Sequence, residues 1–106
     1  MASVKMSLLT YNILRGGKGR EEKIAKVIQA VDPDVVIVQE AQGVASFHRI
    51  AQALEMTAHL AERRRRSPLR VGLLSRLPVL SSRTLDLWPA WPSCLEALFS
   101  LRTGTL

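Results

Sequence analysis

The pattern of apolar and polar positions is most distinctive between residues 32 and 41. Residues 35–38 form an apolar run that follows Pro33 and ends abruptly at Gln39 and Glu40. A short, β-branched run without polar alternation is typical of a strand buried on both faces, and a proline ends any helix before it. An ionised carboxylate beside a dry core requires water, an arginine or a cation. Glu40 is therefore a candidate functional residue.

The residues before this run predict a strand, a loop and a helix. Residues 5–14 have the length and the alternation of a strand, and the glycine-rich sequence RGGKGR follows at 15–20. A helix is expected from residue 21, because acidic residues suit a first turn and an apolar stripe follows at helical spacing. The stripe consists of Ile24, Val27, Ile28 and Val31. Two buried strands joined by one helix are expected to be parallel neighbours with a right-handed crossover.

This topology predicts where two polar side chains lie. Asn12 ends the first strand and Glu40 ends the second, so both are expected at one rim of the sheet, where open α/β sheets hold ligands. An amide oxygen beside a carboxylate oxygen is suited to Mg²⁺ or Mn²⁺. Two structural alternatives remain open at this point. Asn12 fits a backbone hydrogen bond at the turn, and Glu40 fits a pair with Arg15 or Arg20 or a helix cap.

The two histidines offer no general base. Residues 47–54 carry a second helical stripe, and His48 falls beside it, where it is expected to be solvated. His59 belongs to a short predicted strand, TAHL, in which a structural or exposed role is the expected one. Neither residue is assigned to catalysis.

Composition limits the class of protein. The chain has 106 residues, enough for one small domain, and its 15 Lys and Arg against 9 Asp and Glu give a charge of +6, which favours polyanionic partners. The single Cys94 excludes an internal disulfide, and no apolar run reaches the roughly 18 residues of a membrane helix, so a soluble cytoplasmic chain is expected. Residues 63–66, RRRR, predict a solvated turn or a phosphate-contacting patch. Trp88 and Trp91 predict a sheet-edge cover or a stacking surface.

Three segments together resemble a known family. LLTYNIL at 8–14, DPDVVIVQEA at 32–41 and VGLLSRLPVLSS at 71–82 are similar to the endonuclease/exonuclease/phosphatase superfamily, the deoxyribonuclease-like metal-dependent phosphodiesterases and phosphatases. The resemblance implies an α/β fold, the N-terminal half of a four-layer α-β-β-α sandwich, with a mixed sheet and helices on one face. It implies that Asn12 and Glu40 belong to a site for Mg²⁺ or Mn²⁺. The implied substrate is a phosphoric ester, with nucleic acid among the candidates.

The later motifs of that family are not in this sequence: a histidine after a later strand, an Asp-x-Asn segment and a terminal Ser-Asp-His. Residues 95–106 resemble the hairpin before the first of them. We therefore expect residues 1–106 to be a single partial domain, apparently truncated, that supplies metal-site residues, lacks the general base and is inactive alone. Its exposed sheet face is expected to aggregate or to be covered by a second copy or a partner chain.

A different function remains open, namely a non-catalytic nucleotide- or nucleic-acid-binding α/β module that uses the glycine-rich loop and the basic run. Gly17 and Gly19 begin the pattern G-x-G-x-x-G, but Glu22 stands at its third glycine. No G-K-[ST] follows to form a phosphate-binding P-loop. The loop therefore matches neither nucleotide-binding fingerprint.

Overall fold

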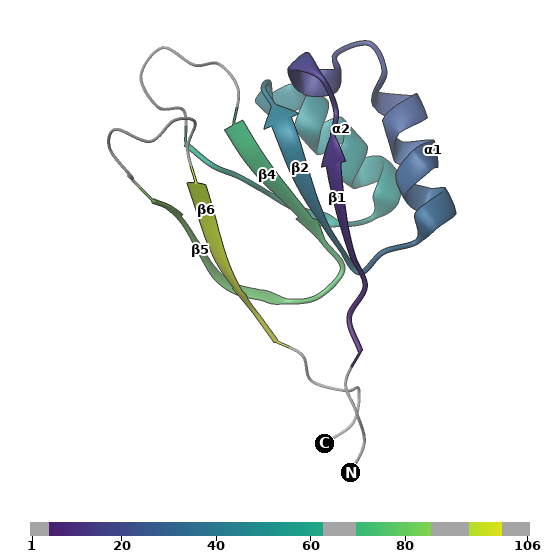
Figure 1. Cartoon of the computed structure of the whole chain (residues 1–106). Helices are drawn as coiled ribbons and strands as arrows, with labels where there is room; N and C mark the ends of the chain where they lie inside the picture. Colours follow the sequence, from purple (N-terminus) through teal and green to yellow (C-terminus); the bar gives the residue numbers. More distant parts are fainter. Residues whose placement is uncertain (1–4, 63–69, 86–93, 101–106) are drawn as a thin grey trace.

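The computed structural model describes residues 5–62, 70–85 and 94–100 of the chain, and their elements are shown in Figure 1. In chain order they are β1 (Leu8–Asn12), a 3₁₀ turn (Arg15–Gly17), α1 (Glu21–Val31), β2 (Val35–Ala41), α2 (Val44–Leu54), β3 (Thr57–Leu60), β4 (Arg70–Ser75), β5 (Val79–Leu85) and β6 (Cys94–Phe99). Both helices cover one face of the main sheet, and the β5–β6 hairpin stands on its other side (Figure 1). The predicted fold class, a mixed sheet with helices on one face, is confirmed.

The main sheet has the strand order β1-β2-β4-β3, and β5 and β6 form a separate antiparallel pair. β1 and β2 are parallel neighbours, as the sequence predicts, whereas β4 is antiparallel to both β2 and β3. Asp34 fixes the register of β1 on β2, because its carboxylate accepts hydrogen bonds from the amide of Ser7 at 2.9 Å and from the Ser7 hydroxyl at 3.2 Å. This register brings Asn12 opposite Gln39, so β1 and β2 end at the same rim.

The core lies between the two helices and the sheet. The apolar run of β2 is buried as predicted: Val35, Val36 and Val38 are almost inaccessible to solvent. Phe47 of α2 packs directly on the backbone of β4, since a Cβ added to Gly72 would lie 2.5 Å from the Phe47 Cζ. The cluster comprises Ile13, Ile24, Ile28, Val36, Val38, Ala41, Phe47, Ile50, Ala51, Met56 and Leu74.

The predicted stripe of α1 is only half right. Ile24 and Ile28 are buried, but Val27 and Val31 are 46% and 55% exposed, and Ala25 is buried in their place. The buried face of α1 is centred between Ile28 and Ala25, which turns Val27 to solvent, and Val31 lies in the last turn of the helix. Helical spacing gave the period of the stripe but not the width of its buried part.

Apolar side chains are exposed on β1 and on the β5–β6 hairpin. Leu8 of β1 is 52% exposed, and Leu80 and Leu98 of the hairpin are 69% and 57% exposed. The basic run 63–66 and both tryptophans, at 88 and 91, lie outside the described residues. Among the residues that are described, no helix is both long and apolar enough to cross a membrane.

Candidate functional site

Asn12 and Glu40 meet at the rim of the sheet where β1 and β2 end. The Asn12 Nδ2 donates a hydrogen bond of 2.5 Å to the Glu40 Oε2, although 28 positions separate the two residues in sequence. We call Asn12 and Glu40 the rim pair. The structure therefore brings together the two residues that the sequence places at strand ends.

A β-bulge in β2 is what turns Glu40 toward Asn12. Val38 pairs with Gly72 and Ala41 with Arg70, so residues 39 and 40 of β2 face a single residue of β4. Regular alternation from the buried Val38 would turn Glu40 toward the helices. The extra residue instead gives Glu40 a φ of 62° and lets Ala41 enter the core, where it is fully buried. A non-glycine residue in this left-handed region costs about 1–3 kcal/mol, and such strain concentrates at functional sites.

Backbone amides hold both side chains of the rim pair. The Leu14 amide donates to the Asn12 Oδ1 at 2.9 Å, which leaves the Asn12 Nδ2 to face the carboxylate. The Arg15 amide donates to the Glu40 Oε1 at 3.2 Å. The Asn12 hydrogen bond, followed by that of the Arg15 backbone, lowers the pKa of Glu40 below its ordinary value. Glu40 is therefore ionised at neutral pH, and each carboxylate oxygen keeps a lone pair for another partner.

The loop after β1 supplies these amides in an unusual conformation. Leu14 and Arg15 have φ values of 56° and 50°, and Gly16 follows with a φ of 80°. Gly16 also approaches Gln42 so closely that a Cβ would lie 2.6 Å from the Gln42 Cβ, so this position requires glycine. The Arg20 guanidinium reaches back to the loop and donates to its carbonyls, a contact that sequence reasoning missed.

The predicted arginine partners of Glu40 take other roles. Glu40 meets Arg15 through the backbone amide, and Arg20 donates to the carbonyls of Ile13 and Leu14. None of the ion pairs in the described ranges involves Glu40. The carboxylate is thus held by neutral donors, and the Arg15 guanidinium contributes only the weakest of the interactions that lower its pKa.

The donor set of the rim fits a hard divalent cation. Mg²⁺ prefers oxygen ligands, keeps several waters and binds through only one or two protein carboxylates, which matches an ionised, accessible Glu40. Within residues 5–62, 70–85 and 94–100, no three His, Cys, Asp or Glu side chains gather as a metal-binding group. A single accessible carboxylate suits a Mg²⁺ or Mn²⁺ site in which water supplies most of the ligands.

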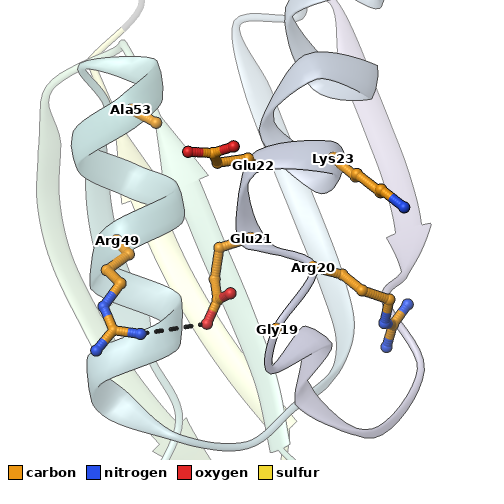
Figure 2. A pocket seen from close by; sticks show the side chains of 7 residues that line it. All are labelled: Gly19, Arg20, Glu21, Glu22, Lys23, Arg49 and Ala53. Atoms are coloured by element: carbon orange, nitrogen blue, oxygen red, sulfur yellow. Dashed lines mark hydrogen bonds and ion pairs between the residues drawn. The ribbon is translucent and has the colours of Figure 1, made fainter.

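A separate hollow of about 500 Å³ lies between the first turn of α1 and the second half of α2, where Arg49 and Ala53 line it. Figure 2 shows Glu21 and Arg49 facing each other across it, with 3.4 Å between Oε2 and Nη1. The pKa of Glu21 lies below its ordinary value, first because its own backbone amide donates a hydrogen bond to the carboxylate. The hydrogen bond with the Ser46 side chain and the charge of Arg49 lower this pKa further. The Glu21 carboxylate thus already lies where a phosphate would bind at this helix N-terminus, which disfavours the nucleotide-binding alternative.

Comparison with known proteins assigns the family. Residues 9–105 match the Endonuclease/Exonuclease/phosphatase family. The chain belongs to this family. It is a family of metal-dependent hydrolases that act on phosphoric esters. No curated protein sequence matches the chain.

Solved structures of the family share this fold. Truncated TDP2 of Caenorhabditis elegans has a TM-score of 0.70 at 15% identity, over 91% of this chain and 41% of its own. ANGEL2, a 2',3'-cyclic phosphatase, has a TM-score of 0.64 at 22% identity, over 76% of this chain and 30% of its own. An AP endonuclease from Archaeoglobus fulgidus has a TM-score of 0.56 at 18% identity, over 80% of this chain and 33% of its own. The chain therefore spans less than half the length of each of these structures.

Proposed function

We propose that the chain supplies the metal-binding part of a phosphoric ester hydrolase site, in which the rim pair binds Mg²⁺ or Mn²⁺. The observation that carries the proposal is the 2.5 Å contact between Asn12 and Glu40, which joins the ends of two parallel strands. Membership of a metal-dependent hydrolase family supports it. The charge of +6 favours a phosphorylated or polyanionic substrate, nucleic acid included.

The two residues of the rim pair have different roles in this proposal. Glu40 supplies the anionic oxygen, and its backbone bulge directs that oxygen out of the sheet end. Asn12 fixes the carboxylate through its amide nitrogen, while its Oδ1, held by the Leu14 amide, keeps a second lone pair. A divalent cation held by these residues would polarise the phosphoryl oxygen and would stabilise the leaving oxygen.

We propose further that the 106 residues alone hydrolyse phosphoric esters slowly or not at all. Activation of water requires a general base, and the histidines of the described residues are not at the rim. His48 of α2 and His59 of β3 line a different hollow, beside the free edge of β3. The rim pair thus accounts for cation binding but not for proton removal.

Titration with Mn²⁺, followed by calorimetry, tests the proposed site. The wild-type chain is expected to bind one Mn²⁺, and Glu40→Gln is expected to abolish saturable binding because it removes the anionic ligand. Asn12→Ala is expected to weaken binding by about 10- to 100-fold, as is usual when a group that orients a ligand is lost. Glu22→Gln removes a similar exposed carboxylate in the first turn of α1 and is expected to leave the affinity unchanged.

Two outcomes would contradict the proposal. Absence of Mn²⁺ binding in the wild-type chain, or equal binding by wild type and Glu40→Gln, would remove the metal site. Turnover of bis(p-nitrophenyl) phosphate that disappears in Glu40→Gln would support the site and would show that the chain is active by itself. A circular dichroism spectrum equal to that of wild type is the control for folding of each variant.

A further inference from the structure

Arg20 contacts the site loop from the side that faces away from the rim pair. Its Nη2 donates to the carbonyl of Ile13 at 2.8 Å and to the carbonyl of Leu14 at 2.5 Å. Arg20 is among the residues that line the hollow between the helices, but Figure 2 shows its side chain pointing away from the Glu21–Arg49 ion pair. One guanidinium nitrogen thus binds two consecutive carbonyls.

The same two peptide groups carry the amides that hold the rim pair. In the peptide group between Ile13 and Leu14, the oxygen accepts a hydrogen bond from Arg20 and the N–H donates one to the Asn12 Oδ1. In the next peptide group, between Leu14 and Arg15, the oxygen also accepts a hydrogen bond from Arg20 and the N–H donates one to the Glu40 Oε1. In a trans peptide the C=O and N–H point in opposite directions. Each peptide group therefore links the guanidinium on one side to the rim pair on the other.

This arrangement gives Arg20 two physical effects on the site. A cation at a carbonyl oxygen makes the N–H of the same peptide a stronger donor, because hydrogen bonds in a chain polarise one another. The guanidinium also stabilises a loop conformation that is costly by itself, since Leu14 and Arg15 both have a positive φ. Both effects hold the amides of Leu14 and Arg15 at the rim.

We propose that Arg20 is a positioning residue of the metal centre, which acts through the two peptide groups that flank Leu14 to hold the rim pair in its cation-binding geometry. The Mn²⁺ measurement below rests on the proposed function, whereas the measurement on the amides does not. Arg20 contacts neither the cation nor a substrate in this proposal.

The sign of the effect on Mn²⁺ affinity separates positioning from charge. If Arg20 acted only as a positive charge near a cation site, its removal would reduce repulsion and tighten Mn²⁺ binding. If Arg20 positions the rim pair, the opposite is expected, namely that Arg20→Gln lowers the affinity for Mn²⁺ by about tenfold. Lys18→Gln is the matched control, since Lys18 is an exposed cation of the same loop with no hydrogen bond or ion pair in the described residues. It is expected to leave the affinity unchanged or slightly tighter.

The amide resonances of Leu14 and Arg15 report on the two peptide groups directly. In ¹H–¹⁵N spectra without metal, Arg20→Gln is expected to shift both amide protons upfield and to speed their exchange with solvent, because each donor bond weakens. Arg20→Lys restores a cation and is expected to give intermediate values in both measurements. Lys18→Gln is expected to leave both resonances in place.

Unchanged amide resonances in Arg20→Gln would overturn the proposal, as would Mn²⁺ binding that tightens in Arg20→Gln to the same extent as in Lys18→Gln. If Arg20→Gln does not fold, the same two measurements on Arg20→Lys test the proposal. Amide resonances and a Mn²⁺ affinity equal to those of wild type in that variant would overturn it. If the wild-type chain binds no Mn²⁺, the proposed function fails. The shifts of the two amides then still show whether Arg20 holds the loop.

Discussion

Replacement of Gly72 by alanine tests how closely α2 packs on the sheet next to the site. The new Cβ would lie 2.5 Å from the Cζ and 2.8 Å from the Cε1 of Phe47, whereas carbon atoms require about 3.5–4 Å. Phe47 is only 1% exposed, so its ring cannot move into solvent. Overpacking of this kind costs about 1–3 kcal/mol, and the lower entropy of the unfolded chain returns about 0.4–1 kcal/mol. We expect Gly72→Ala to lower the free energy of unfolding by about 1–2 kcal/mol.

Urea unfolding followed by circular dichroism measures this loss. Gly43→Ala is the matched control, because no atom lies within 4 Å of its Cβ position and its φ of −85° suits alanine. Gly43 is the N-cap of α2, where alanine is less favourable than glycine, so this variant is expected to lose some stability but less than Gly72→Ala, because it causes no overpacking. Phe47→Leu makes room for the new methyl group, so the double variant Gly72→Ala/Phe47→Leu is expected to lose less than the sum of the single variants. A wild-type urea midpoint for Gly72→Ala, or strict additivity in the double variant, would refute the close packing of Phe47 on Gly72.

Three further predictions concern the loop, the helix and the open face. Gly17→Ala is expected to destabilise the chain more than Gly19→Ala in urea melts. Both glycines have a positive φ, but only the Cβ added at Gly17 would meet other side chains, namely those of Ile24 and Ile13. The pKa of Glu21 is lowered by folding, so its contribution to stability is present above its unfolded pKa and is lost as pH falls through the folded value. Urea melts of Glu21→Gln and wild type are therefore expected to differ near neutral pH and to converge as the pH falls through the lowered pKa of folded Glu21. Leu80→Lys, on the exposed hairpin, is expected to reduce self-association in sedimentation velocity runs, and an unchanged distribution would contradict a role of this face in aggregation.

The sequence predicts those parts of the fold that depend on local pattern. The β-branched run of β2 and the stripe of Phe47, Ile50 and Ala51 appear in the structure as a buried strand and a buried helix face, because burial there follows the periodicity. Val27 shows the limit of this reasoning. Its spacing places it in the apolar stripe of α1, but the depth to which a helix sinks on a sheet depends on residues from other elements.

The sequence predicts which two residues meet at the candidate site, but it does not predict the detailed geometry of the site. Parallel pairing of two buried strands is enough to place Asn12 and Glu40 at one rim. The bulge that turns Glu40 is not visible in the sequence, since a glutamate with a positive φ goes against local preference and is imposed by pairing with β4. The role of Arg20 is equally hidden, because a lone arginine before a helix gives no sign that its side chain reaches back to two carbonyls.

Paramagnetic broadening by Mn²⁺ locates the bound cation relative to the rim pair. When a small fraction of an equivalent of Mn²⁺ is added to ¹⁵N-labelled chain, the amide signals of Asn12, Leu14, Arg15 and Glu40 are expected to broaden first. Those near Asp34, at the opposite end of β2, are expected to stay sharp. The same addition to Glu40→Gln is expected to broaden no signal selectively. Broadening centred on Asp34, or an identical pattern in wild type and Glu40→Gln, would contradict the assignment of the rim as the metal centre.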